Sequence, residues 1–577
     1  MGAIVGQRTP QGAREWQTEK TVTTCSYCGD GCRLVLHSYR GKVVRVASQT
    51  EKGLNQGNLC IKGRFGLGYA DSPDRLTKPL VRNASGELAE ASWDDALARV
   101  KEKLSAVRAE KGGKAIAAIA GTNLTNEAAY LTQKLLRTVL SSNNVDAIDH
   151  GEQAAAEEAL AKALGVAVAT NSRKDLGAAA AILVAGANLT ESDPVLALDV
   201  IKALRSGKTV IVLDPRATEL ATKAEYHLPV KPGTDLAALR AMLRIILDEG
   251  LEDAGFIAEN TAGFATFQSS LAEVDVAAEA AVAGIDVDTL PAAAAAFGRA
   301  DAAAIIFGRG VTEGPDAADT VAALADLALL TGNLGRPGTG LYPLRSGANS
   351  QGLADMGVHP ALLPGGVAAG APAGLTTDEI VPAIEKGEID ALYVIGADPA
   401  LALADETRVR AALDKVGFLV VQDSFLSDTA QYADVVLPAA VAGEDEGTFT
   451  NTERFVQRVR AAVPALGESR SDWKIVQALA NALGAGWTYA APADVMREIA
   501  VVAPTYNGIS YEKIEKEGVQ TPCGSAECSG MAIYFADGFT EKKAEFAPVP
   551  KGAAPVVTGA DFPFALLTGS AREHHAT

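Results

Sequence analysis

Cysteine and positive charge are both scarce in this chain, and each scarcity excludes a class of protein. Six cysteines in 577 residues cannot build the disulfide framework of a small secreted domain. The 52 basic residues face 71 acidic ones, and a formal net charge of −19 would repel the phosphates of a nucleic acid. We therefore expect no nucleic-acid partner.

Long hydrophobic runs are missing as well. No apolar run approaches the ~18–20 residues needed to span a bilayer. The N-terminus, Met1-Gly-Ala-Ile-Val-Gly-Gln-Arg, has neither a basic-then-apolar secretory pattern nor a twin-arginine signal. We expect a cytoplasmic protein with no direct membrane span. At 577 residues, 48% of them apolar, the chain can form several lobes around large cores.

Four of the six cysteines are grouped near the N-terminus in a C-x2-C-x3-C-x27-C array, Cys25, Cys28, Cys32 and Cys60. Three thiolates within eight residues cannot pair with one another without strain, but they can bind three corners of a metal cluster. Four cysteines suit a [4Fe–4S] cluster or an all-cysteine zinc site. Zinc ribbons usually carry two C-x2-C pairs, and Cys60 stands alone, which favours the cluster.

The two remaining cysteines, Cys523 and Cys528, lie far from the array. A second [4Fe–4S] cluster would normally need four more cysteines, so we expect none. We expect both to be reduced structural thiols.

Beyond the array, short apolar runs alternate with amphipathic segments, a pattern typical of doubly wound α/β layers. Strands are expected at 115–120, 180–185, 209–213, 303–307, 391–395 and 418–422. Several end in glycine or aspartate, where loops cross the carboxyl edge of a parallel sheet and ligands bind. Near the array, 33–36 and 41–46 predict a short hairpin.

Several motifs carry a family resemblance. The cysteine motifs are Cys25-Ser-Tyr-Cys-Gly-Asp-Gly-Cys and Cys60-Ile-Lys-Gly-Arg-Phe-Gly, and the other matching stretches are 186–194, 214–216, 231–235, 331–340 and 447–454. On these motifs the chain resembles the molybdopterin-dependent oxidoreductases from about Thr21 to Asp561. Among them it resembles cytoplasmic formate dehydrogenase catalytic subunits and the large iron–sulfur subunit of respiratory complex I.

This resemblance implies an α/β protein with an N-terminal [4Fe–4S] lobe and two doubly wound α/β lobes. The implied parts are a polar arm at 1–24, the cluster lobe at 25–75, a first α/β lobe at 76–150 and 345–555, a second at 151–344, and a stub at 556–577. The stub would be the opening of a C-terminal β-rich, dinucleotide-binding lobe. That lobe is expected to be essentially absent.

The two α/β lobes of the family clasp a bis-molybdopterin guanine dinucleotide. By resemblance, the cofactor-binding positions are Gly186, Asn188, Asp214, Arg216, Gly233, Asp235, Gly396, Asp398, Thr448 and Asn451. Glycines let backbone amides approach a pyrophosphate, and Asp214 or Asp235 can accept from a ribose or guanine edge. Lys62 matches the lysine between cluster and pterin, where a cation would raise the cluster potential and hydrogen-bond the pterin.

The chain departs from formate dehydrogenases at the metal. Those enzymes ligate it with a cysteine or selenocysteine followed by a histidine, and here Glu152 and Gln153 occupy these positions. A soft ligand has become a hard carboxylate, and an imidazole that can shuttle a proton has become a neutral amide. Arg345 still matches the arginine that would hold a formate carboxylate.

These departures leave several functional hypotheses. We favour an iron–sulfur electron-transfer subunit of a multisubunit oxidoreductase, partnered by flavin- and iron–sulfur-bearing subunits that handle NAD(P)H or ferredoxin. The alternative is an active molybdenum or tungsten bis-pterin oxidoreductase with Glu152 as a carboxylate ligand. A metal-free pterin pocket that binds a nucleotide is a third hypothesis, and a zinc-bearing module without a redox role is a fourth.

Overall fold

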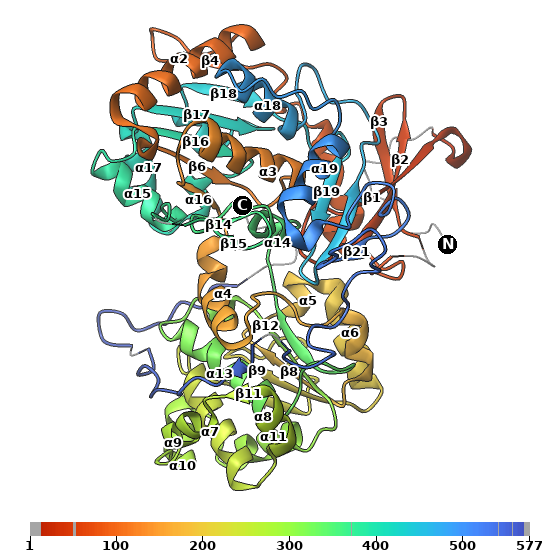
Figure 1. The fold of residues 1–577 in the computed structure, drawn as a ribbon, viewed down its shortest axis with the longest axis vertical. Helices are drawn as coiled ribbons and strands as arrows, with labels where there is room; N and C mark the ends of the chain where they lie inside the picture. The colour runs from red at the N-terminus through yellow and green to blue at the C-terminus, as the bar shows by residue number, and fades with distance from the viewer. Residues whose placement is uncertain (1–12, 50–52, 371, 541, 557, 570–577) are drawn as a thin grey trace. The chain divides into compact units, whose positions relative to one another are not determined.

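The computed structural model describes residues 13–49, 53–370, 372–540, 542–556 and 558–569. They form two compact units (Figure 1). Unit 1 contains the described residues of 1–151 and 346–530, and unit 2 contains those of 152–345 and 531–574.

Unit 1 begins with the lobe that carries the cysteine array. Its elements are η1 (Glu15–Gln17), β1 (Glu19–Thr24), β2 (Arg33–Tyr39), β3 (Lys42–Ala47), α1 (Ile61–Phe65) and η2 (Gly66–Asp71). The three strands form an antiparallel sheet in the order β1-β2-β3. The predicted hairpin is confirmed as β2 and β3.

The predicted polar arm is wrong at 19–24, which form β1, while residues 1–12 lie outside the described residues. Thr23 and Thr24 are buried and bonded: the Thr23 hydroxyl accepts from the amide of Arg460, and the Thr24 hydroxyl donates to the carbonyl of Arg458. The sequence did not indicate this strand because its threonines are polar and are buried only by residues more than 400 positions away.

The main sheet of unit 1 has seven strands in the order β5-β4-β18-β17-β16-β6-β7. Five are parallel, and β4 and β5 join antiparallel at one edge. The strands are β4 (Leu80–Arg82), β5 (Leu88–Glu90), β6 (Ile116–Ala120), β7 (Val145–Ala147), β16 (Ala391–Ile395), β17 (Phe418–Asp423) and β18 (Val435–Pro438).

Successive side chains of a strand point to opposite faces of this sheet. Both faces are apolar because helices cover both. In β6, Ile116 and Ala118 pack into one core and Ala117 and Ile119 into another. The first core is covered by α2 (Trp93–Lys111), α3 (Asn126–Lys134), α18 (Asp472–Ala482) and α19 (Pro492–Val502). The second is covered by α15 (Thr377–Glu385), α16 (Pro399–Ala402) and α17 (Glu406–Lys415) (Figure 1).

Smaller elements complete unit 1. A second sheet contains β19 (Gly447–Thr450), β20 (Phe455–Val459) and β21 (Val519–Gln520), and β14 (Leu362–Leu363) pairs with β15 (Val367–Ala368). The other helices are η3 (Gly113–Ala115), the π-helical η4 (Leu135–Val139), α14 (Ser350–Asp355), η6 (Thr429–Tyr432) and η7 (Pro504–Tyr506).

Unit 2 is built on a parallel five-stranded sheet in the order β10-β9-β8-β12-β13. Its strands are β8 (Ala181–Ala185), β9 (Thr209–Leu213), β10 (Tyr226–Leu228), β12 (Ala303–Phe307) and β13 (Gly340–Pro343). All six strands expected from apolar runs are therefore confirmed, as β6, β8, β9, β12, β16 and β17.

Helices cover both faces of this sheet as well. One face packs on α4 (His150–Leu164), α7 (Asp235–Asp248), α8 (Ala254–Asn260), α9 (Phe264–Ser270), α10 (Val276–Ala283), α11 (Thr289–Gly298) and α13 (Ala317–Leu330). The other packs on η5 (Arg173–Ala178), α5 (Leu189–Ser192) and α6 (Pro194–Arg205). The short α12 (Arg309–Thr312) follows β12.

The first α/β lobe was predicted to extend to residue 555, but the structure assigns the described residues from 531 onward to unit 2. Strand β22 (Ala544–Glu545) pairs with β11 (Thr261–Ala262) of unit 2. Phe546 and Val549 are buried in that unit's core. This apolar anchoring assigns the segment to unit 2.

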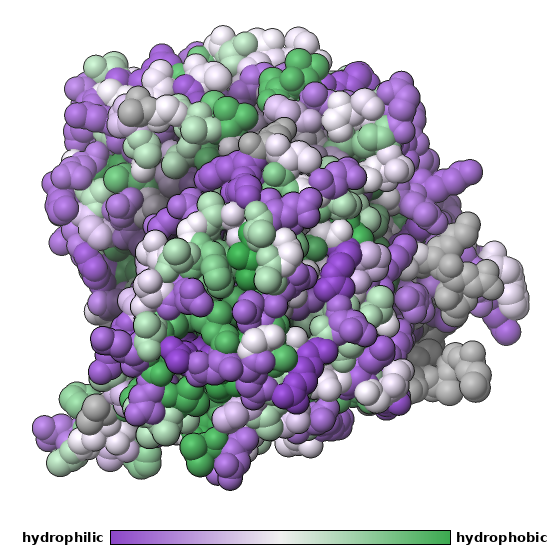
Figure 2. Space-filling view, turned by 60° about the horizontal axis from the view of Figure 1, so that its bottom comes forward, coloured by the Kyte–Doolittle hydropathy of each residue, from purple (hydrophilic) through white to green (hydrophobic). Residues whose placement is uncertain are grey.

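The surface is mixed in character. Figure 2 shows hydrophilic residues over much of one face, with hydrophobic residues among them. Among the helices of the described residues, none is both long and apolar enough to cross a membrane.

Candidate metal centre and cofactor pocket

The first three cysteines of the array lie on one loop between two strands. Cys25 directly follows β1 and Cys32 directly precedes β2. The amide of Cys25 donates to the carbonyl of Cys32 over 2.8 Å, which closes the loop. All three side chains are buried, at 5–7% exposure.

The fourth cysteine reaches the same place from the start of α1. The amide of Gly63 donates to the Cys60 sulfur over 3.4 Å. A Cβ at Gly63 would lie 3.6 Å from the sulfur of Cys25 and 3.9 Å from that of Cys60, so the two sulfurs face a common point. The structure thus brings together thiols that are 35 positions apart.

Burial dominates the electrostatics of this site. Burial raises the pKa of the Cys25 thiol to about 12, with the nearby Cys60 adding to the shift and the Lys62 ammonium opposing it. A buried thiol of this kind becomes a thiolate when a metal ion coordinates it. None of these four cysteines is part of a disulfide. The donor set fits a [4Fe–4S] cluster held by Cys25, Cys28, Cys32 and Cys60.

The sheet of β19 and β20 supports the cysteine loop. The amide of Thr452 donates to the carbonyl of Gly29 over 3.0 Å, and the Gln457 side chain donates to that of Gly31 over 3.0 Å. Gly31 has φ +64°, and a Cβ there would lie 2.4 Å from the Gln457 side-chain oxygen. Asn451, predicted to bind a cofactor, donates to the carbonyl of Asp30 at 3.5 Å instead. It therefore lies against the loop.

A pocket of about 470 Å³ opens beside the cysteine loop in unit 1. Residues Cys25–Tyr27 form part of its wall, together with the residues that follow β6, β16, β17 and β18. This is the carboxyl edge of the parallel strands, where α/β proteins bind ligands. Gly396 and Asp398, two of the predicted cofactor-binding positions, line the pocket, whereas Thr448 and Asn451 do not belong to the lining.

Three carboxyl groups that sequence reasoning missed line this pocket: those of the buried Asp445 and Asp472 and of the partly buried Asp423. Burial raises the pKa of Asp423 and of Asp445 to about 6. It raises the pKa of Asp472 to about 8, with the charges of Asp445 and Asp423 adding to the shift, while a bond from Gln422 lowers it. These groups can accept hydrogen bonds from a ligand rich in N–H groups.

The raised pKa of Asp472 predicts a pH dependence of stability. The folded protein holds this proton more tightly than the unfolded chain, so the contribution to stability is greatest below about pH 4 and is lost as pH rises towards 8. We expect the melting temperature of Asp472→Asn to fall less between pH 5 and 8 than that of the wild type. The exposed Asp414→Asn on α17 should keep the wild-type slope. Equal slopes for wild type and Asp472→Asn would contradict the assignment.

Two predicted positions in unit 1 have bonds to the protein itself. The Asp398 carboxylate accepts from the amides of Asp428 and Thr429 and from the Thr429 hydroxyl. Thr448 is fully buried and bonds Glu127, whose pKa burial raises to about 7. Asp398 and Thr448 thus hold the strand ends in place.

The predicted positions of unit 2 gather at the carboxyl edge of its sheet. Gly186 follows β8 with φ +57°, and a Cβ there would lie 2.6 Å from the amide of Val311, so glycine is required. Asp214 follows β9, and its carboxylate accepts from the amide of Arg216 over 2.8 Å. Burial raises the pKa of Asp235 to about 6, and the charge of Asp214 adds to the shift, so these carboxylates lie near each other.

The remaining members of this set lie on loops of the same edge. Asn188 directly precedes α5, and its backbone carbonyl accepts from the amides of Glu191 and Ser192 over 3.0 Å. Gly233 has φ +79° in the turn before α7.

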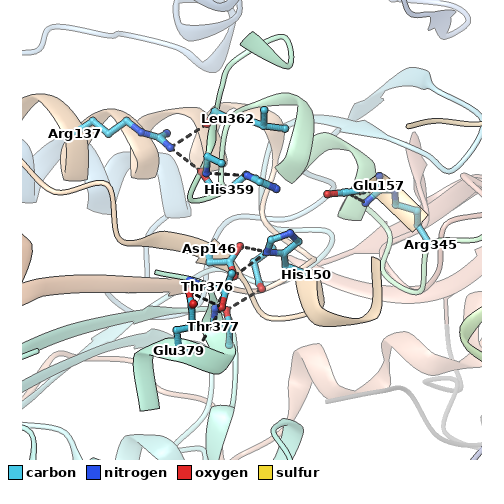
Figure 3. A network of polar contacts seen from close by, with 12 residues as sticks. Arg137, Asp146, His150, Glu157, Arg345, His359, Leu362, Thr376, Thr377 and Glu379 are labelled. Carbon is cyan, nitrogen blue, oxygen red and sulfur yellow. Dashed lines mark hydrogen bonds and ion pairs between the residues drawn. The ribbon is translucent and has the colours of Figure 1, made fainter. Parts of the chain in front are cut away.

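The proposed metal ligand and the proposed formate-binding residue both form ion pairs in unit 2. The Glu152 carboxylate lies 3.1 Å from the Arg309 guanidinium, which also bonds Glu313. Arg345 is buried at 5% exposure and donates to Glu157 over 2.8 Å (Figure 3). Each pair neutralises the side chain that substrate chemistry would use.

A histidine pair in unit 1 had no role in the sequence prediction. The His150 Nδ1 lies 2.9 Å from the Asp146 carboxylate, which also accepts from the amide of Thr377 (Figure 3). The rings of His150 and His359 are 4.3 Å apart between centroids. The two histidines are about 200 positions apart, so spacing could not indicate the pair.

The two cysteines outside the array correct a prediction. Cys523 and Cys528 form a disulfide, whereas reduced thiols were expected. The loop between them turns back on itself, with the amide of Cys528 donating to the carbonyl of Ser525, and the Cα atoms are 5.7 Å apart. That separation lies within the usual range for a disulfide.

Comparisons with known proteins agree with this architecture. Residues 75–482 match the family model described as Molybdopterin oxidoreductase, and residues 18–72 match that of the Molybdopterin oxidoreductase Fe4S4 domain. The chain is 37% identical over 574 residues to the F420-dependent formate dehydrogenase 2 subunit alpha of Methanococcus maripaludis, covering 96% of this chain and 84% of that protein.

Two further similarities complete the comparison. A putative formate dehydrogenase of Bacillus subtilis is 36% identical over 554 residues, which cover 92% of this chain but only 56% of that longer protein. The solved structure of acetylene hydratase from Pelobacter acetylenicus has a TM-score of 0.75 at 20% identity, covering 91% of this chain and 77% of that one. The structural likeness supports the fold.

Proposed function

This chain belongs to the molybdopterin oxidoreductase family, and we propose that it is the iron–sulfur electron-transfer subunit of a multisubunit oxidoreductase. As a member of this family the chain is an oxidoreductase subunit, and its cofactors are a [4Fe–4S] cluster and a molybdopterin. We propose further that its own formate-type metal site is inactive.

Two ion pairs carry this proposal, that of Glu152 with Arg309 and that of Arg345 with Glu157. A formate-binding arginine must offer its guanidinium to the substrate carboxylate, and the buried Arg345 donates to Glu157. A carboxylate metal ligand must offer its oxygens to the metal, and Glu152 faces Arg309. Both arrangements favour a chain without substrate chemistry of its own.

The cluster site, in contrast, has the features that electron transfer needs. A [4Fe–4S] cluster supplies one-electron transfer when bound. Cys25, Cys28, Cys32 and Cys60 would hold it, and the burial of the first three keeps their side of the site away from water. Lys62 lies close enough to lower the pKa of Cys25, so its positive charge would also favour a reduced cluster.

The pocket of unit 1 would hold one end of the molybdopterin. Asp423, Asp445 and Asp472 would accept hydrogen bonds from the N–H groups of a pterin or guanine ring. The backbone at Gly396, where φ is +58°, would allow close approach of such a ring. In this proposal the pterin has a structural role.

The second candidate is an active molybdenum or tungsten enzyme with Glu152 as ligand. One observation favours it: Arg309 is 45% exposed, and such solvent-exposed ion pairs contribute little free energy, on the order of 0–1 kcal/mol. Glu152 could leave Arg309 for a metal at small cost. Arg345 is buried with Glu157 and has no such freedom.

We propose flavin- and iron–sulfur-bearing subunits that handle NAD(P)H or ferredoxin as partners, in the cytoplasm. A single cluster needs both a donor and an acceptor of electrons. One relative is itself named as the alpha subunit of a formate dehydrogenase.

Elemental analysis of the anaerobically purified protein tests the proposal. We expect about four iron atoms per chain, without stoichiometric molybdenum, tungsten or zinc. Stoichiometric molybdenum or tungsten would favour the second candidate. Zinc in place of iron would overturn both.

Replacing Glu152 separates the two candidates by kinetics. We expect Glu152→Gln to keep its iron content, and its dithionite-reduced cluster, freed of excess dithionite, should pass electrons to an artificial one-electron acceptor within about twofold of the wild-type rate, since the cluster thiols are untouched. Glu313→Gln is the matched control, because Glu313 bonds the same Arg309. Formate-dependent reduction of the acceptor that occurs in the wild type and in Glu313→Gln but collapses in Glu152→Gln would identify a working metal ligand.

A further inference from the structure

A lysine lies against both sulfurs of the disulfide in unit 1. The Lys513 Nζ is 3.3 Å from the sulfur of Cys523 and 4.0 Å from that of Cys528. The same ammonium donates to the carbonyl of Ala526 over 2.9 Å and to that of Ser525 over 3.4 Å. These bonds to the intervening loop hold the positive charge beside the disulfide.

The two sulfurs differ in access. Cys523 is fully buried in the core formed by α2, α3, α18 and α19. Its amide donates to the carbonyl of Thr505 and its carbonyl accepts from the amide of Gly508. Cys528 is half-buried, and residues 524–527 between the two are exposed. An attacking thiolate can therefore reach Cys528 more readily than Cys523.

We propose that Cys523, Cys528 and Lys513 form a dithiol–disulfide exchange site that takes electrons from a dithiol reductant. A thiolate of the reductant attacks the Cys528 sulfur, forms a mixed disulfide and expels Cys523 as a thiolate. Lys513 stabilises this leaving group, because a thiolate next to an ammonium is favoured. The second thiol of the reductant then attacks its own sulfur in the mixed disulfide and releases Cys528.

The exchange balances without any other reactant. The reductant is oxidised by two electrons to its disulfide, Cys523 and Cys528 are reduced by the same two electrons, and two protons pass from the reductant's thiols to theirs. The reverse reaction with an oxidised dithiol restores the bond. Where thiols are kept reduced, disulfides are usually transient and either catalytic or redox-sensing, which agrees with this assignment.

The exchange site is connected to the cysteine loop through hydrogen bonds. Thr521, two residues before Cys523, exchanges bonds with Arg454: its amide donates to the Arg454 carbonyl over 3.0 Å, and its own carbonyl accepts from the guanidinium. Two residues before Arg454, the amide of Thr452 donates to the carbonyl of Gly29 in the cysteine loop. The inference does not depend on the proposed function, since it requires no electron transfer through the cluster.

The test measures the rate of reduction by dithiothreitol. The full chain, purified anaerobically, is mixed with the reagent at pH 7, quenched with acid, alkylated, and digested so that the peptide carrying Cys523 and Cys528 is quantified by mass. We expect complete reduction of the folded protein, and Lys513→Met should slow it by about three- to tenfold. Lys513→Arg keeps the positive charge and should restore most of the rate.

Two results would overturn the proposal. One is a Lys513→Met variant that is reduced as fast as the wild type. The other is a disulfide that is reduced only after the chain is unfolded with guanidinium, which would make it a structural cross-link. Circular dichroism of each variant establishes that the comparison is between folded proteins, and Lys516→Met, which removes an exposed lysine three residues away, controls for net charge.

Discussion

Cys28→Ser should yield a protein without its iron–sulfur cluster. Cys28 lies on the loop closed by the bond between Cys25 and Cys32, is 7% exposed, and is followed by a glycine whose carbonyl is held by Thr452. These hydrogen bonds hold the loop in place, and a serine hydroxyl is a poor ligand for iron compared with a thiolate. We expect loss of nearly all of the iron, against about four atoms per chain in the wild type.

Iron content and the electron paramagnetic resonance spectrum of the dithionite-reduced protein check this prediction. The matched control is Cys528→Ser, the same substitution outside the array, which should retain both the iron and the signal. Limited proteolysis should also cut Cys28→Ser faster between residues 25 and 75, because metal binding stabilises a small lobe with few core residues. A Cys28→Ser protein with an unchanged cluster signal would refute the ligand assignment.

The parts of the fold that could be predicted are those encoded in short stretches of sequence. The strand Ala391–Ile395 is a continuous apolar run because both faces of its sheet are buried, and such runs are visible in any window. The cysteine array was visible for a similar reason, since three ligands lie within eight residues. Local patterns record local structure.

The pocket could not be predicted in this way. Asp423 ends β17 and Asp472 begins α18, and only the packing of α18 on the sheet brings their carboxyl groups to one cavity. The hydrogen bond from Tyr511 to the buried Glu127 could not be predicted either, because the two residues are 384 positions apart. The prediction that Cys523 and Cys528 are reduced thiols was wrong for a related reason. It rested on the number of cysteines, which does not show whether the two sulfurs lie close together in the fold.

Arg75→Ala should strongly destabilise unit 1, because Arg75 is a buried charged residue. Arg75 and Glu444 form a two-pronged salt bridge with side chains 0% and 5% exposed, at 2.8 and 3.3 Å. Removing one partner leaves the other charge buried without compensation, at a cost of about 3–5 kcal/mol. Arg75 also donates to the carbonyl of Ala70, and the next residue, Leu76, bonds the carbonyl of Ser424. The pair therefore fixes the end of the cluster lobe to the main sheet of unit 1.

The measurement is the thermal unfolding midpoint of each variant, with iron retention followed in parallel. Lys78→Ala is the matched control three residues away, because Lys78 and its partner Glu90 are 46% and 63% exposed and such pairs contribute on the order of 0–1 kcal/mol. The double variant Arg75→Met/Glu444→Leu should regain more than half of the lost stability, since it removes both charges and keeps much of the volume. If the double variant were as unstable as Arg75→Ala, the loss would arise from packing and from the Ala70 bond, and the buried charge would not be its cause.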